Sequence, residues 1–140
     1  GYSKKVRENY QYSFNATIGH TENGLASIAT NDTKAARWYG ITNYFMFRVR
    51  DKFDAGLRVE WFYDKGNSRI MGVPISDFYE GGNYVNISLC TNFFLNEKTV
   101  IRPELRWDWS DTIVNGTERP FADFNSSNQI TLGIDFVHEF

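Results

Sequence analysis

The chain has 140 residues, enough for one domain, and its 15 basic and 17 acidic residues give a formal charge of −2. This balance lacks the basic surplus of a nucleic-acid-binding protein, and the single cysteine, Cys90, excludes an internal disulfide and any cysteine-rich zinc site. Aromatic residues make up 17% of the chain although its mean hydropathy is −0.47. A transmembrane β-barrel accounts for both values, because each strand faces lipid on one side and water on the other.

Six segments alternate apolar and polar residues with a period of two, which is typical of β-strands with two unlike faces. In chain order they cover residues 8–20, 37–50, 53–64, 83–95, 99–109 and 129–140. In the segment 53–64, for example, Leu57 and Val59 fall on one face and Arg58 and Glu60 on the other. Asn43 interrupts the apolar face of the second segment. The pattern predicts an all-β, antiparallel up-and-down barrel with about six strands in this chain.

The predicted connections alternate between short and long. Residues 51–53 and 96–98 form short turns, whereas the other links run roughly over 19–36, 65–82 and 110–128 and are rich in Gly, Asn, Asp and Ser. Outer-membrane barrels have this asymmetry, with short periplasmic turns and long external loops. We therefore expect the two short turns to face the periplasm and the three long links to face outside.

Three-residue turns predict the pairing within two hairpins. The expected pairs are Arg50–Asp54, Phe47–Leu57 and Tyr44–Glu60 in the first hairpin, and Phe93–Ile101, Asn92–Arg102, Leu89–Leu105 and Ile87–Trp107 in the second. In both hairpins apolar residues mostly meet apolar residues, as strands with one apolar face require. Mid-strand leucines (Leu57, Leu89 and Leu105) are expected near the bilayer midplane, and Ser88 on the polar face is expected to tolerate a charge.

Tryptophan and tyrosine gather on the apolar face beside the long links. A belt of such amphipathic rings marks the membrane interface, and the predicted interface residues are Tyr39, Trp61, Tyr63, Trp107 and Trp109. The aromatic residues near the short turns are Phe47, Phe53 and Phe93. In an alternative interpretation, the same rings pack the core of a soluble β-sandwich.

The polar face carries charges of both signs and is the candidate functional surface. Its predicted pore-lining residues are Arg48, Arg50, Arg58, Glu60, Arg102, Glu104, Arg106 and Asp108. Two compatible roles follow: a salt-bridge network that stiffens the wall, or charges that set the electrostatic field in a channel. Three of the carboxylates have an arginine two residues away, which favours ion pairing over acid–base chemistry. No nucleophile, metal, P-loop or dinucleotide motif occurs, so we predict no enzyme, no cofactor and no metal site.

The end of the chain and three internal stretches carry a family resemblance. Phe140 ends an amphipathic strand and resembles the signal read by the bacterial outer-membrane assembly machinery. The stretches "WYGITNYFMFRVRDKFDAGLRVEWFYDKG", "RPELRWDWSD" and "NQITLGIDFVHEF" resemble the carboxy-terminal part of the β-barrel porin family called OmpL-like or porin-2. The resemblance covers roughly residues 37–140 and is weaker over 1–36. It implies a Gram-negative outer-membrane barrel that acts as a diffusion channel, and supplies no catalytic or substrate residues.

Six strands are fewer than the roughly eight of the smallest single-chain barrels, because an open edge leaves backbone groups unpaired in hydrocarbon. Residues 1–140 are therefore predicted to form a single barrel segment completed by further strands or chains, most simply as part of a longer polypeptide. The leading functional hypothesis is a porin-like channel segment for passive diffusion of small solutes. The alternatives are a non-conducting architectural barrel that anchors an assembly through its long loops, and a soluble β-sandwich binding module. The expected partners are outer-membrane lipid, the barrel assembly machinery, and the rest of the barrel or other subunits.

Overall fold

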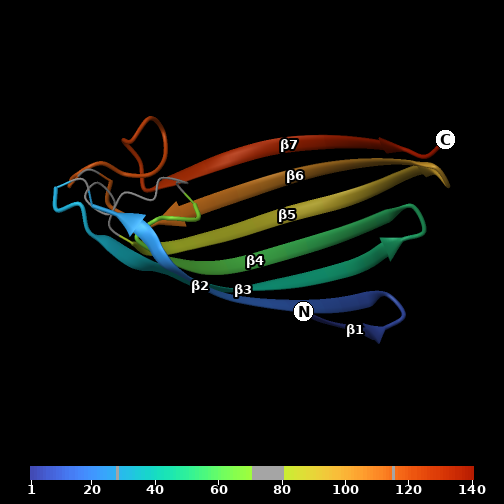
Figure 1. Cartoon of the computed structure of the whole chain (residues 1–140). Coiled ribbons are helices and arrows are strands. Elements are labelled where there is room, and N and C mark those ends of the chain that lie inside the picture. Colours follow the sequence, from blue (N-terminus) through green and yellow to red (C-terminus); the bar gives the residue numbers. More distant parts are fainter. Residues whose placement is uncertain (28, 71–80, 115) are drawn as a thin grey trace.

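The strands form one antiparallel sheet (Figure 1). The computed structural model describes residues 1–27, 29–70, 81–114 and 116–140, and these ranges contain seven strands. Each strand pairs with the next in the chain, in the order β1-β2-β3-β4-β5-β6-β7. Their bounds are β1 Tyr2–Arg7, β2 Tyr10–Ala26, β3 Thr33–Arg50, β4 Phe53–Lys65, β5 Gly82–Asn96, β6 Thr99–Ser110 and β7 Asn128–His138. No helix in the described ranges is long and apolar enough to cross a membrane.

The predicted all-β, up-and-down class is confirmed, with seven strands where about six were expected. The additional strand is β1, which pairs with β2 through Tyr2–Phe14 and Lys4–Tyr12. In the described residues β1 and β7 form the two edges of the sheet and do not pair with each other, as in part of a barrel. These strands form one sheet with no second sheet packed against it, which is not the architecture of a β-sandwich.

Long and short connections lie at opposite ends of the sheet, as predicted (Figure 1). The short turns contain two residues each, 51–52 and 97–98, and a similar turn at 8–9 joins β1 to β2. Two long links, at 66–81 and 111–127, lie where they were expected, although positions 71–80 and 115 fall outside the described residues.

The first long link is much shorter than predicted. Strands β2 and β3 continue past His20 and Arg37, so that only residues 27–32 connect them. The sequence Asn23-Gly24, which is typical of turns, instead lies where the pairing shifts between Thr21 and Leu25. Asn23 has a φ of 54° there, so the dipeptide makes an irregularity within a long hairpin rather than ending the strand.

The predicted register is confirmed for one hairpin and wrong for the other. Strands β5 and β6 pair through Phe93–Ile101, Leu89–Leu105 and Ile87–Trp107, as expected. Strands β3 and β4 instead pair through Arg48–Asp54, Phe45–Leu57 and Thr42–Glu60, two residues away from the prediction. The reason is a shorter turn combined with an irregularity between Arg48 and Arg50. A shift of two residues keeps every side chain on its face.

The sheet has one apolar face and one polar face. Apolar side chains are exposed and polar side chains are buried, which is the reverse of the arrangement in a soluble protein. The apolar face carries a row of leucines that are neighbours across β4 to β7, namely Leu57, Leu89, Leu105 and Leu132. Leu89 is 56% and Leu132 72% exposed. The polar face carries Arg58, Ser88 and Arg106 at the adjacent register positions, and Ser88 is only 2% exposed. A sheet that exposes leucine and buries serine suits a lipid-facing outer surface and an enclosed polar inner surface.

Aromatic rings bound the apolar face at both ends. At the long-link end Tyr39 stacks on Tyr63 with ring centroids 5.1 Å apart, and at the short-turn end Phe53 packs on Phe93 at 4.8 Å. From Phe53 to Tyr63 strand β4 runs through eleven residues (53–63). A tilted transmembrane strand needs about 9–11 residues to cross the hydrocarbon layer. The number of residues between the two aromatic ends therefore matches one crossing of the hydrocarbon layer.

The polar interruption on the apolar face has a partner. The Tyr12 hydroxyl donates a hydrogen bond of 2.7 Å to Oδ1 of Asn43 from the neighbouring strand. This bond lowers the cost of placing an amide among apolar side chains. Asn43 is therefore accommodated within the apolar face.

Replacing Leu89 by Arg is expected to lower the free energy of unfolding of the complete barrel by about 2–4 kcal/mol, because the charge would face hydrocarbon near mid-strand. Reversible unfolding in lipid vesicles measures this cost. The matched control is Asn92→Arg on the same strand, since Asn92 lies on the polar face opposite Asp54. Equal costs at the two positions would contradict the assignment of the faces.

Ser88 is unsuitable as that control, contrary to the expectation from sequence. Its side chain is buried and its hydroxyl donates a hydrogen bond of 3.2 Å to Oδ1 of Asn86. An arginine at this position would displace the hydrogen-bonded network beneath the surface. A residue on the polar face therefore does not necessarily tolerate substitution by a charged residue.

Candidate pore-lining face

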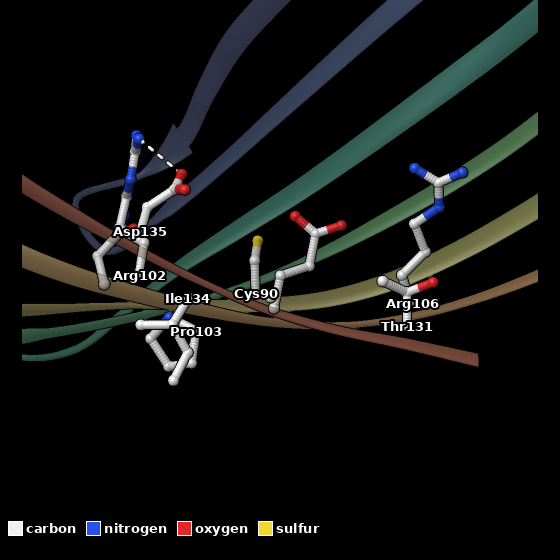
Figure 2. Close-up of a pocket in the computed structure, with 10 residues that line it drawn as sticks. Cys90, Arg102, Pro103, Arg106, Thr131, Ile134 and Asp135 are labelled. Atoms are coloured by element: carbon white, nitrogen blue, oxygen red, sulfur yellow. Dashed lines mark hydrogen bonds and ion pairs between the residues drawn. The ribbon is translucent and has the colours of Figure 1, made fainter.

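The charged residues predicted to line a pore come from β3, β4 and β6 and lie on the polar face, with one departure. Figure 2 shows the side chains of Arg102, Arg106 and Asp135 projecting from one side of the sheet, while Pro103 and Ile134 project from the other. Strand pairing places the remaining members on the same side. They are Arg48 opposite Asp54, Arg58 opposite Ser88, Glu60 opposite Asn86, Glu104 opposite Cys90, and Asp108 opposite Asn86.

Arg50 is the departure. The irregularity in β3 makes it the partner of Phe53 rather than of Asp54. Arg50 also lines a small hollow together with Val49, Phe53 and Phe93 at the short-turn end. It therefore lies beside the apolar face, where an arginine can extend its charged group toward the membrane surface.

A hydrogen-bonded network crosses the centre of the polar face from β4 to β7. Arg58 donates from Nε and Nη2 to Oδ1 of Asn86, at 3.0 and 2.6 Å. Asn86 in turn donates from Nδ2 to Oδ1 of Asp108 at 2.7 Å. Asp108 also accepts from Nε of Arg106 at 2.8 Å and from Nε2 of Gln129 at 3.3 Å. Four strands are thus linked through one buried amide and one buried carboxylate.

Two further ion pairs flank the network. Arg48 pairs with Asp54 across β3 and β4, and Arg102 Nη2 lies 3.1 Å from Oδ2 of Asp135 across β6 and β7. The ion pairing expected from sequence is found for Asp108 with Arg106. Among the described residues it is not found for Glu60 or Glu104. Glu60 instead accepts a hydrogen bond of 3.0 Å from the Thr42 hydroxyl.

Glu104 lines a shallow cavity on the polar face. Figure 2 labels other residues of its lining, among them Cys90 and Arg106. The cavity has a volume of about 430 Å³, and its polar lining includes Cys90, Asn92, Arg102, Arg106 and Thr131. It is open on one side, so water can reach these groups. The described residues contain no group of three or more His, Cys, Asp or Glu side chains arranged to hold a metal ion.

The start of the link after β4 turns over the polar face at the long-link end. The buried Asp64 carboxylate accepts hydrogen bonds from the backbone N–H groups of Arg69 and Ile70, at 2.7 and 2.9 Å. The Arg69 guanidinium lies 3.8 Å above the ring of Trp38. Sequence reasoning missed this contact, although the alternation places Trp38 and Asp64 on the polar face, where they pair. These contacts reduce the open space at this end of the face.

The predicted interface residues lie on the apolar face near the long links. Trp61 packs edge-on against Tyr39 at 5.6 Å and donates a hydrogen bond of 3.0 Å from Nε1 to Oδ1 of Asn83. Trp107 and Trp109 lie on the same face, opposite Ile130 and Asn128. Rings with both an apolar body and a bonded polar tip suit a membrane interface.

Phe140 lies two residues beyond the end of β7 and is fully exposed. The backbone N–H of Glu139 still donates a hydrogen bond of 2.9 Å to the carbonyl of Lys98, and the His138 and Phe140 rings pack edge-on at 5.0 Å. The aromatic end of the chain is therefore presented at the short-turn end of the sheet.

One comparison identifies relatives of this chain. Residues 2–140 match the model of a protein family described as "Putative beta-barrel porin-2, OmpL-like". The comparison with curated proteins and the comparison with solved structures returned no match. The family match also covers residues 2–36, where the resemblance inferred from the sequence was weaker.

Replacing Asn86 by Leu is expected to lower the free energy of unfolding of the barrel by about 1–3 kcal/mol, because Arg58 and Asp108 both lose a hydrogen-bond partner in an enclosed position. Chemical unfolding in detergent or lipid measures the change. Thr131→Val on the same face is the control, since Thr131 is exposed. If the two variants lost the same stability, the network would contribute nothing specific.

Proposed function

The chain belongs to the OmpL-like β-barrel porin-2 family, and we propose that it forms part of the wall of an outer-membrane channel for passive diffusion of small solutes. The observation that carries this proposal is the polar face. At its centre Asn86 and Asp108 are buried and Asn86 bonds to both Asp108 and Arg58, while leucines are exposed on the opposite face. Such a face is costly against hydrocarbon and suits contact with water.

Charge balance on the polar face supports a channel without strong preference for either ion sign. Its arginines are Arg48, Arg58, Arg102 and Arg106, and its carboxylates outside the long-link end are Asp54, Glu60, Glu104, Asp108 and Asp135. Opposite charges held close together give a small net field, which mobile ions screen further. We therefore propose that the solutes are small and hydrophilic, without selection for one sign of charge. We propose no catalytic step.

The sheet must be completed for this function. Backbone groups at an unpaired edge cost several kcal/mol each in hydrocarbon, and β1 and β7 each present one such edge. We propose that further strands or chains close the barrel. Phe140, exposed beyond β7, is proposed to contact the assembly machinery during insertion.

A second candidate function is favoured by the link that turns over the polar face. Asp64 and Trp38 hold the first residues of this link, up to Ile70, against the wall at one end. A barrel narrowed in this way can serve as a non-conducting anchor for a surface assembly. Single-channel recording on the complete barrel separates the two functions: discrete conductance supports the channel, and a folded, silent barrel supports the anchor.

Neutralising Arg58, Arg102 and Arg106 together to Gln is expected to shift the channel toward cations, because it leaves Asp108 and Asp135 without their paired arginines. Reversal potentials across a salt gradient measure the shift. It should shrink as salt is raised, since wall charges are screened within about 8–10 Å at moderate ionic strength. The control is Arg50→Gln, which removes one arginine charge beside the apolar face and is compared per charge removed.

Unchanged selectivity in a folded, conducting triple variant would mean that these arginines lie away from the ion path. A shift in the Arg50→Gln control about one third as large as that of the triple variant would mean that the effect reflects total charge rather than the polar face.

The proposed orientation places the two-residue turns in the periplasm and the long links outside. A protease recognition sequence inserted after Gly116, in an exposed part of a long link, should be cut when protease is added to intact cells. The same sequence inserted after Lys52 should be protected until the outer membrane is opened. Cleavage only at the Lys52 insertion in intact cells would reverse the orientation.

A further inference from the structure

Three basic side chains lie in one row across β2, β3 and β4, directly beyond the aromatic belt. Strand pairing places His20 opposite Arg37 and Arg37 opposite Lys65, and all three residues are exposed. We name this row, His20–Arg37–Lys65, the basic row. It has no part in the polar face or in the channel proposed above.

The basic row lies on the apolar face. Each member lies two residues along its strand, and on the same side of it, from a residue of the apolar face at the level of the belt. These residues are Ile18, Tyr39 and Tyr63, which pair with one another across the three strands. Ile18 is 86% exposed, and the Tyr39 and Tyr63 rings are stacked. Two residues of a tilted strand correspond to a rise of about 5 Å along the membrane normal. The basic row therefore lies at the level of lipid headgroups, above a surface that acyl chains can contact.

The arginine and lysine cations of the basic row are not neutralised by ion pairs in the part of the sheet that the structure describes. Among the described residues neither Arg37 nor Lys65 forms an ion pair. Glu22 lies two residues beyond His20 in the irregular part of β2, and Asp111 follows the end of β6. Asp111 already accepts two hydrogen bonds from Asn83, at 2.6 and 2.7 Å.

We propose that the basic row binds the phosphate group of an anionic lipid in the membrane leaflet next to the long links. A guanidinium and an ammonium side by side provide several donors for phosphate oxygens. The exposed apolar residues immediately below favour a lipid over a free phosphate ion, because the acyl chains gain contact with the belt. The inference rests on the membrane location proposed above, but not on conductance.

Lipid binding by the complete, detergent-solubilised protein tests this inference through native mass spectrometry. The probes are bisphosphorylated lipid A, zwitterionic phosphatidylcholine and inorganic phosphate. Lipid A is expected to be retained over phosphatidylcholine. The double variant Arg37→Gln/Lys65→Gln should bind it about 30-fold more weakly at low salt, about fivefold for each charge removed. The matched control is Lys52→Gln/Lys98→Gln, which removes two charges at the short turns and should bind like the parent protein.

Several results would overturn the inference. The first is that the control variant weakens lipid A binding as much as the double variant does. The second is that lipid A and phosphatidylcholine are retained equally. The third is that millimolar inorganic phosphate displaces lipid A, which would indicate a site for free phosphate. Conductance is recorded on the same samples. Loss of lipid A binding with unchanged conductance supports the inference, whereas a silent barrel that still discriminates between the lipids contradicts only the channel function.

Discussion

A strand that crosses a membrane must bond every backbone N–H and C=O group to its neighbours and present apolar side chains to hydrocarbon. The other features of this sheet depend on that constraint. Each strand pairs with the next along the chain, and leucines such as Leu89 and Leu105 are exposed on one face. The alternate residues must then be compatible with an enclosed interior, which explains why serine, asparagine and aspartate are buried here.

Enclosure of polar groups creates a second requirement, because a buried amide or carboxylate needs bonded partners. Asn86 meets it by accepting from Arg58 and donating to Asp108. The arginines are therefore wall components as well as charges facing solvent. This face can therefore both stiffen the wall and line a pore. The same side chains bond to the wall with some atoms and remain accessible to water with others.

Alternation along the sequence was sufficient to predict strands β2 to β7, their faces and the pairing of β5 with β6. It failed where local backbone geometry intervenes. The irregularity between Arg48 and Arg50 moved the β3–β4 register and took Arg50 out of the polar face, and Asn23-Gly24 did not end its strand. Strand β1 was missed because Ser3, Lys4 and Lys5 interrupt any apolar pattern. The Arg58–Asn86–Asp108 network depends on side-chain conformations across three strands, which no periodicity encodes.

Spin labels along β6 can show whether alternate residues of a strand face lipid and water. Single labels are placed from Ile101 to Trp107 in the complete barrel in lipid, after Cys90 is replaced by serine. We expect labels at Ile101, Leu105 and Trp107 to be accessible to oxygen. Labels at Arg102, Glu104 and Arg106 should instead be reached by a water-soluble paramagnetic reagent. Accessibility without a period of two, or with the two sets exchanged, would contradict this assignment of the two faces.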